Sequence, residues 1–200
     1  MSAGCQVEFP VHTRAEFYEL ERDSLIRHEF FNGCIVAMAG GSPRHGRIIG
    51  EVSGILRDAL LDTSCFAVPN DQIIRVDAAD MDAYPDVVVY CEEAAFDKRF
   101  DRALLEPLAL VEVLSPSTKN FDLSTKRTNY FMLPTLCDYL VFWQDKIRLD
   151  QWSRPRDGGG EPTLTRHLQR DSGVKLEALG IKFRLGDCYR RFDDLPEGAL

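Results

Sequence analysis

The chain has 200 residues, and its 44% hydrophobic content is enough for the core of one ordinary domain, so a single domain is expected over residues 1–200. Its formal net charge of −8, from 24 basic and 32 acidic side chains, excludes a general nucleic-acid-coating protein, because phosphate neutralisation needs clustered Lys and Arg.

The N-terminal stretch lacks the basic start and apolar middle of a signal peptide, and no run approaches the length of a membrane helix. We therefore expect a cytoplasmic protein with no membrane partner. The six cysteines contain no Cys-x-x-Cys pair, which excludes the common zinc and redox motifs. Since most of them lie in or beside apolar runs, all six are expected to be reduced and structural.

The first elements are a short helix and a hairpin. Residues 13–16 have the pattern of a capping box before an amphipathic helix. Strands over 27–31 and 34–38 flank Asn32-Gly33, the dipeptide best suited to a tight turn with positive φ at both positions. Glu29 is thereby predicted to lie in a strand, among aromatic neighbours.

The next element is the helix that the sequence indicates most clearly. Ser42 can cap it, Pro43 suits its first position, and apolar residues continue at helical spacing to Leu60. Short strands are then expected over 65–68 and 72–76. His45, at the start of this helix, would contact phosphate or serve local structure, and the second alternative is the commoner one.

Two buried strands each carry one carboxylate. Asp86 opens the run that continues through Val87–Val89, and Glu112 lies inside the apolar run 108–114. A carboxylate in such a run must offset its desolvation with a partner of opposite charge. A divalent metal ion would satisfy both acids. By themselves, however, Asp86 could cap backbone amides, and Glu112 could be an ion-paired core residue.

A helix predicted over residues 123–133 brings Lys126 close to these acids. Asp122 is expected to cap this helix, and Tyr130 lies one turn after Lys126 on the same face. Lys126 alone could equally be a solvated helix residue. Glu29 could face solvent or pair with Arg27 rather than contact water or metal, so we rank it as an auxiliary acid.

Together these residues suit phosphodiester cleavage. Mg²⁺ takes hard oxygen ligands and keeps several waters, so Asp86, Glu112 and the carbonyl of Val113 would suffice to hold it, and Mn²⁺ is expected to substitute. Lys126 would orient the attacking water or stabilise developing negative charge.

The remaining elements complete a mixed sheet. Strands are expected over 138–143, 146–152 and 163–169, with a short final segment around 183–192. Trp143 and Trp152 are interpreted as core or interface packing, because no basic side chains alternate with them in the sequence. The order of elements predicts an α/β or α+β domain whose mixed sheet is covered by helices.

The phrase Val111-Glu112-Val113-Leu114-Ser115-Pro116-Ser117-Thr118, with Tyr84-Pro85-Asp86 before it and Asp122, Lys126 and Tyr130 after it, resembles the Uma-two family of restriction endonucleases, within the PD-(D/E)XK nuclease superfamily. Glu29 before Asn32-Gly33, and Gly40-Gly41-Ser42 with His45, are similar to the first half of that pattern, so the resemblance extends over most of the chain.

The resemblance implies a restriction-endonuclease-like α/β fold, a mixed central sheet flanked by helices with added hairpins, Mg²⁺ dependence and homodimers. The superfamily signature puts lysine two residues after the second acid, where this chain has Leu114. The resemblance implies that Lys126 takes that role from the following helix.

The leading hypothesis is a Mg²⁺-dependent endonuclease that hydrolyses DNA, with Asp86 and Glu112 as ligands, Lys126 as catalytic cation and Glu29 in support. The first alternative is a binding or assembly module of the same fold that has weak or no turnover, which the acidic charge and displaced lysine favour. The second alternative is a metal-dependent hydrolase of another phosphate ester.

Overall fold

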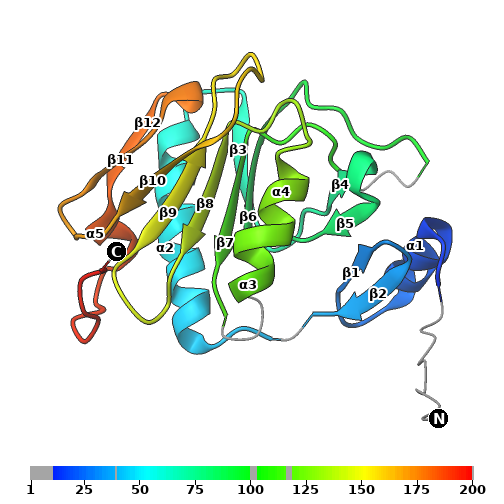
Figure 1. Cartoon of the computed structure of the whole chain (residues 1–200), viewed down its shortest axis with the longest axis horizontal. Helices are drawn as coiled ribbons and strands as arrows, with labels where there is room; N and C mark the ends of the chain where they lie inside the picture. Colours follow the sequence, from blue (N-terminus) through cyan, green and yellow to red (C-terminus); the bar gives the residue numbers. More distant parts are fainter. Residues whose placement is uncertain (1–10, 39, 100–102, 116–118, 200) are drawn as a thin grey trace, which may run out of the picture.

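The computed structural model describes residues 11–38, 40–99, 103–115 and 119–199. A six-stranded sheet with the order β10-β9-β8-β7-β6-β3 forms its centre (Figure 1). In this sheet β7 and β8 run parallel, and the other neighbouring pairs are antiparallel. A four-stranded sheet, β2-β1-β5-β4, and the hairpin β11–β12 accompany it. The predicted mixed α/β architecture is therefore confirmed.

The strands are β1 His28–Phe31, β2 Cys34–Ala37, β3 Cys65–Pro69, β4 Ile74–Val76, β5 Met81–Ala83, β6 Val87–Cys91, β7 Ala109–Val113, β8 Asp138–Phe142, β9 Leu149–Ser153, β10 Thr163–His167, β11 Gly173–Leu176 and β12 Ile181–Arg184. The α-helices are α1 Arg14–Asp23, α2 Pro43–Leu60, α3 Lys119–Phe121, α4 Arg127–Tyr130 and α5 Leu185–Cys188. A π-helical turn, Asp122–Lys126, joins α3 to α4, and 3₁₀ turns lie at Asp77–Ala79 and Glu177–Leu179.

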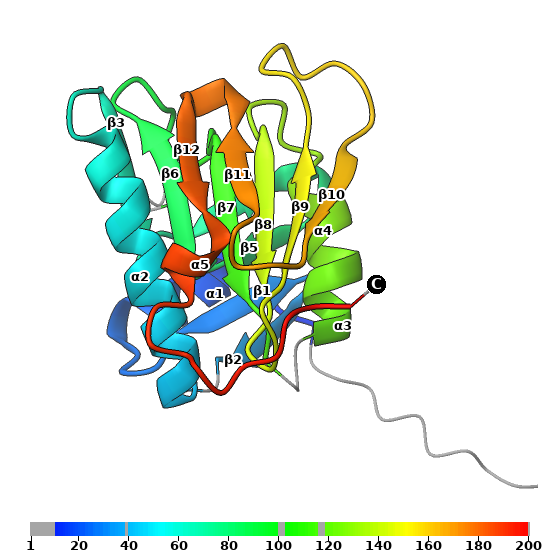
Figure 2. The same cartoon turned by 90° about the vertical axis from the view of Figure 1, so that its left-hand side faces the viewer.

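Both faces of the central sheet are covered. On one face α2 packs with α5 and the hairpin β11–β12 against alternate residues of β6, β7 and β8 (Figure 2). On the other face Tyr130 and Leu133 pack together with β4 and β5. Strands buried on both sides are continuously apolar rather than alternating. A carboxylate within them is therefore exceptional and must be explained by its partners.

The local signals that begin the chain act as predicted. Asn32 and Gly33 have φ values of 46° and 80°, so the turn between β1 and β2 uses positive φ at both positions. The Ser42 hydroxyl accepts the backbone N–H of His45 at 3.1 Å and caps α2. The turn fixes Glu29 in β1, and the Ser42 cap fixes the position of His45 at the start of α2.

The cysteine prediction is wrong for one pair. Cys65 and Cys91 form a disulfide, because they lie directly opposite each other in the antiparallel register of β3 and β6. Cys137 and Cys188 are free and buried, as predicted, whereas the free Cys34 is exposed. Cys5 lies outside the described residues.

Two further elements differ from expectation. The hairpin β11–β12 was not predicted as such, because its exposed lysines interrupt the apolar pattern. The helix expected over 123–133 begins at Lys119 and contains the π-helical turn. None of the described helices combines the length and apolar character needed to cross a membrane.

Candidate active site

The two strand carboxylates lie beside each other. β6 and β7 pair with Val87 opposite Val111, so Asp86, just before β6, is level with Glu112 in β7. Both are buried, with 8% and 5% of their surface exposed. Asp86 Oδ2 accepts the backbone N–H of Val113 at 2.6 Å. The expectation that these acids sit on neighbouring strands is met.

Lys126 lies among three carboxylates. Its Nζ is 2.8 Å from Glu29 Oε1 and 3.2 Å from Glu112 Oε1. A third acid, Asp122, has Oδ1 at 3.6 Å from the same nitrogen. Three of the residues singled out in the sequence, Glu29, Glu112 and Lys126, are thus brought together from β1, β7 and the π-helical turn.

Glu29 is fixed by the backbone as well as by the lysine. Its Oε1 accepts the N–H of Tyr84 at 3.2 Å, two residues before Asp86. Arg27, the alternative partner considered for Glu29, pairs with Asp71 instead. Glu29 therefore belongs to the buried cluster and does not face solvent.

The assignment of Asp122 as a helix cap is wrong. The helical segment begins three residues earlier, at Lys119, so Asp122 lies within it and its side chain is buried beside Lys126. The i,i+4 spacing from Asp122 to Lys126 is a signal from which this shared face could have been predicted. A π-helical turn at this point is a feature often found at functional sites.

Tyr130 completes the contacts of Glu112. Its hydroxyl donates to Glu112 Oε1 at 3.3 Å, which confirms that it shares a face with Lys126. Burial raises the pKa of the Tyr130 phenol well above its usual value, and the nearby carboxylates raise it further. Tyr130 is therefore a neutral hydrogen-bond donor at ordinary pH.

His45 reaches the other acid from α2. Its Nε2 lies 3.2 Å from Asp86 Oδ2. Burial would lower the pKa of His45, but its hydrogen bond to Asp86 and the Asp86 charge outweigh burial and raise it, with the Val113 backbone adding to the effect. This contact was missed in the sequence, because it depends on how α2 packs against the sheet.

The cluster contains more acidic than basic side chains. Burial raises the pKa of Glu112 well above its usual value, and Asp122, Asp86 and Glu29 add to the rise while Lys126 opposes it. Burial would lower the pKa of Lys126, but Glu112, Glu29 and Asp122 together raise it well above its usual value. Lys126 is therefore a permanently charged ammonium among acids that it does not fully neutralise.

The donor set has the right chemistry for a hard divalent cation. The described residues contain no group of three or more His, Cys, Asp or Glu side chains arranged to hold a metal ion. The predicted set is smaller, with two carboxylates and the Val113 carbonyl, and Mg²⁺ commonly completes such a set with water. The excess of buried carboxylate charge fits the binding of a further cation.

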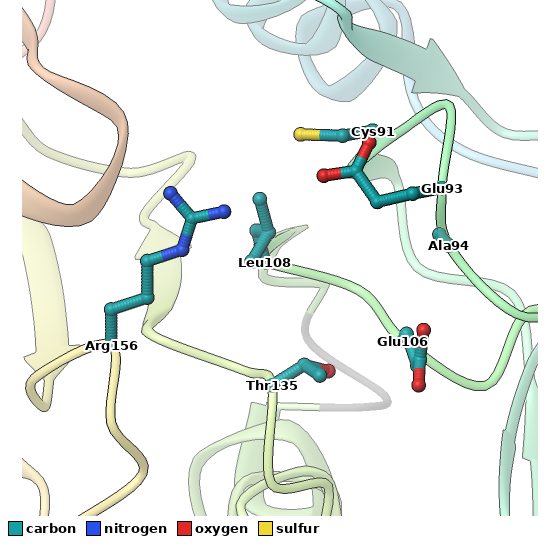
Figure 3. A pocket seen from close by; sticks show the side chains of 7 residues that line it. All are labelled: Cys91, Glu93, Ala94, Glu106, Leu108, Thr135 and Arg156. Atoms are coloured by element: carbon teal, nitrogen blue, oxygen red, sulfur yellow. The ribbon is translucent and has the colours of Figure 1, made fainter.

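A separate hollow of about 160 Å³ lies at the opposite end of β6 and β7 (Figure 3). Its lining includes Cys91, which ends β6, and Leu108, which precedes β7, together with Arg156. In Figure 3 the Arg156 guanidinium faces the Cys91 and Glu93 side chains across the opening. None of the residues predicted for the site lines this hollow.

The mixed sheet, with acids on adjacent strands beside a lysine, fits the restriction-endonuclease-like fold that the sequence resemblance implies. The model of the Uma-two family, described as "putative restriction endonuclease", matches residues 14–186. The chain belongs to this family.

The chain is also similar to two other proteins and to one solved structure. An uncharacterized protein of Synechocystis sp. PCC 6803 is 30% identical over 182 residues, covering 91% of this chain and 93% of its own. A second uncharacterized protein of the same organism is 30% identical over 145 residues, covering 72% and 82%. A crystal structure described as a putative nuclease from Anabaena variabilis ATCC 29413 has a TM-score of 0.63 at 14% identity, covering 83% of this chain and 91% of that one. At that identity the likeness shows the fold alone.

Proposed function

We propose that this chain is a Mg²⁺-dependent endonuclease that hydrolyses phosphodiester bonds of DNA. The observation that carries the proposal is the convergence of Glu29, Glu112 and Asp122 on the Lys126 ammonium. Buried charges in excess of their partners are costly to a fold and are typical of sites with a chemical task.

Asp86 and Glu112 would hold the metal ion, with the carbonyl of Val113. When bound, Mg²⁺ supplies Lewis-acid stabilisation of phosphate charge and a more acidic bound water. The contacts of Val113 N–H and His45 orient Asp86, and the Tyr130 hydroxyl orients Glu112. Such supporting contacts commonly set the affinity of a site for its metal.

Lys126 would stabilise the negative charge that develops on the phosphate, or orient the attacking water. Its ammonium is held at one point by Glu29 and Glu112, so little reorganisation is needed during the reaction. Glu29 acts through this contact and is a positioning residue rather than a catalytic one. The lysine thereby works from the π-helical turn, although Leu114 stands at the usual lysine position.

The test is cleavage of supercoiled plasmid DNA by the purified chain. We expect nicking or linearisation with Mg²⁺ or Mn²⁺, and its abolition by EDTA, by Glu112→Gln and by Lys126→Gln. Glu177→Gln, in an exposed 3₁₀ turn, is the matched control and should cut like the wild type. Metal-dependent turnover of small phosphate esters but not DNA would favour the other hydrolase, and metal-independent DNA binding without turnover would favour the binding module.

We also propose that the chain forms a homodimer, as the family resemblance implies. Support comes from residues 11–38, which hold most of the exposed large apolar side chains among the described residues: Val11, Leu20, Leu25, Ile26, Val36 and Met38. Exposed apolar patches of this kind favour association. Sedimentation equilibrium should give a dimer that Leu25→Asp converts to monomer, and a monomeric wild type would contradict the proposal.

A further inference from the structure

Three cations gather on the indole ring of Trp143. Lys119 Nζ lies 3.9 Å from a Trp143 ring centroid, Lys146 Nζ 4.5 Å and the Arg148 guanidinium carbon 4.4 Å. The sequence did not indicate this arrangement, because Lys119 belongs to α3 whereas the other two follow β8. Trp143 is buried as predicted, and its basic neighbours come from separate segments of the chain.

Two of these cations have no carboxylate partner among the described residues. Arg148 pairs with Asp150: its Nε donates to Oδ1 at 2.8 Å and its Nη2 donates to Oδ2 at 2.9 Å. Within the part of the chain that the structure describes, no carboxylate lies within 4.0 Å of Lys119 or Lys146. A cation–π contact holds an ammonium in place without neutralising it. Both lysines therefore keep their charge available to an anion, in a chain whose acids outnumber its bases.

Lys119 and Trp143 line a hollow of about 310 Å³, and Lys146 and Arg148 lie against the same indole ring. Its lining is Leu114, Ser115, Lys119, Trp143, Gln144 and Asp145. The hollow thus begins at Leu114, two residues beyond Glu112 and about 7 Å further along the chain. Its lining has one acid, Asp145, and one cation, Lys119, and Lys146 adds a second ammonium on the Trp143 ring.

Gln144 fixes this hollow against the candidate active site. Its Nε2 donates to the Leu114 carbonyl at 2.5 Å, and its Oε1 accepts the Ser42 hydroxyl at 2.7 Å. Ser42 in turn caps α2, the helix whose His45 contacts Asp86. The end of β7, the end of β8 and the start of α2 are therefore tied together, so the hollow and the acid cluster keep a fixed spacing.

We propose that this hollow is a second phosphate subsite, in which Lys119 and Lys146 hold a phosphate of the DNA strand adjacent to the one cleaved. The inference rests on the proposed function and deepens it by assigning residues to a neighbouring phosphate, which a mononucleotide or a free phosphate ester lacks. Lysine contacts to phosphate strengthen binding and position the protein on the strand, but they do not recognise the base sequence. Each such contact also contributes to the salt dependence of binding.

The first experiment measures binding without cleavage. A fluorescent DNA duplex is titrated with the chain by anisotropy, with Ca²⁺ in place of Mg²⁺ and salt varied over about 50–200 mM. Lys119→Gln with Lys146→Gln is compared with Lys175→Gln with Lys182→Gln, two exposed lysines that face each other across β11–β12 and change the net charge equally.

We expect the first double variant to lose about tenfold or more in affinity, and its plot of log affinity against log salt to become shallower by about 1–2 units. The control pair should leave both quantities near the wild-type values. Equal affinity and slope in the two double variants would overturn the subsite, and if plasmid cleavage by the wild type persisted the nuclease assignment would still stand. A wild type that neither binds nor cuts DNA would overturn both proposals.

A second readout follows the indole itself. The chain has two tryptophans, so Trp152→Phe leaves Trp143 as the sole emitter. Oligonucleotide should change this emission saturably, over the concentration range found by anisotropy, because the ammonium groups move toward the phosphate. Inorganic phosphate at the same concentration should have little effect. Unchanged Trp143 emission at saturating oligonucleotide, or an equal response to inorganic phosphate, would overturn the proposal.

Discussion

Two ionic clusters of the structure differ in how many of their acids are buried. In one, the carboxylate of Asp82 is fully buried and accepts the Tyr18 hydroxyl at 2.5 Å, Arg75 Nε at 3.0 Å and Arg14 Nε at 2.5 Å. In the other, the Lys126 ammonium lies among the carboxylates of Glu29, Glu112 and Asp122.

The difference separates a structural cluster from a candidate active site. Asp82 joins α1 to the four-stranded sheet, and both of its oxygens have cationic partners. Around Lys126 the acids exceed the cation, and the pKa of Glu112 rises as a result of burial and of its acidic neighbours. The other acids that pair with Arg14 and Arg75 are Asp77, Asp80 and Asp97, and all three keep some exposure to solvent, whereas the three acids around Lys126 are all buried. Only the second cluster fits a further cation.

The largest effect on stability is expected from Asp82→Ala. Removing one partner of a buried ion pair leaves uncompensated charge, which costs about 3–5 kcal/mol of the free energy of unfolding. Asp77→Ala, whose exposed carboxylate also pairs with Arg14, is the control and should cost less than about 1 kcal/mol. Urea unfolding measures both, and similar losses would contradict the structural role of Asp82.

Glu112→Gln, unlike Asp82→Ala, should reduce cleavage without reducing stability. Cleavage is expected to fall by at least about 100-fold, because losing even an indirect partner of a metal can have effects of that size. The free energy of unfolding without metal should stay unchanged or rise, since the substitution removes a carboxylate from an acid-rich cluster. A large loss of stability in urea would show that Glu112 serves the fold and would count against the comparison.

The sequence indicates the acids of the site better than their partners. Asp86 and Glu112 stand out because they interrupt apolar strands, and the spacing of Lys126 and Tyr130 places both on one helix face. The contact of His45 with Asp86 depends on how α2 packs on the sheet, which no local pattern encodes.

Two errors have equally specific causes. Asp122 was assigned as a cap because Asp is a common residue at helix starts, although its spacing to Lys126 indicated a shared face. The Cys65–Cys91 pair is separated by 26 residues and depends on the register of β3 against β6. The mixed sheet, in contrast, follows from the order of apolar runs and was predicted.

Tyr130→Phe should produce a smaller change at the site. The substitution keeps the ring and removes the hydroxyl that donates to Glu112 Oε1. A hydrogen bond to a charged group contributes about 1.5–3 kcal/mol of stabilisation. Without this one, we expect the affinity for metal to fall by about 10-fold, with little change in the fold. Calorimetric titration with Mn²⁺ measures this, and an unchanged affinity would show that Tyr130 does not orient Glu112.

The smallest effect concerns a histidine outside both clusters. Burial lowers the pKa of His167, whose Nε2 lies 3.0 Å from Gln151 Oε1. Its contribution to stability is therefore present above the unfolded-state pKa and declines as the pH falls below it. Between pH 7.5 and 5.5 the wild type should lose more unfolding free energy than His167→Gln. Equal losses would exclude His167 as a source of acid sensitivity.

The most direct test of the central claim is anomalous diffraction from crystals soaked with Mn²⁺. The account predicts one strong peak bound by carboxylate oxygens of both Asp86 and Glu112, and its absence in Glu112→Gln crystals. Soaked wild-type crystals with no peak at these two side chains, from a preparation that cuts DNA only when Mn²⁺ is added, would contradict it.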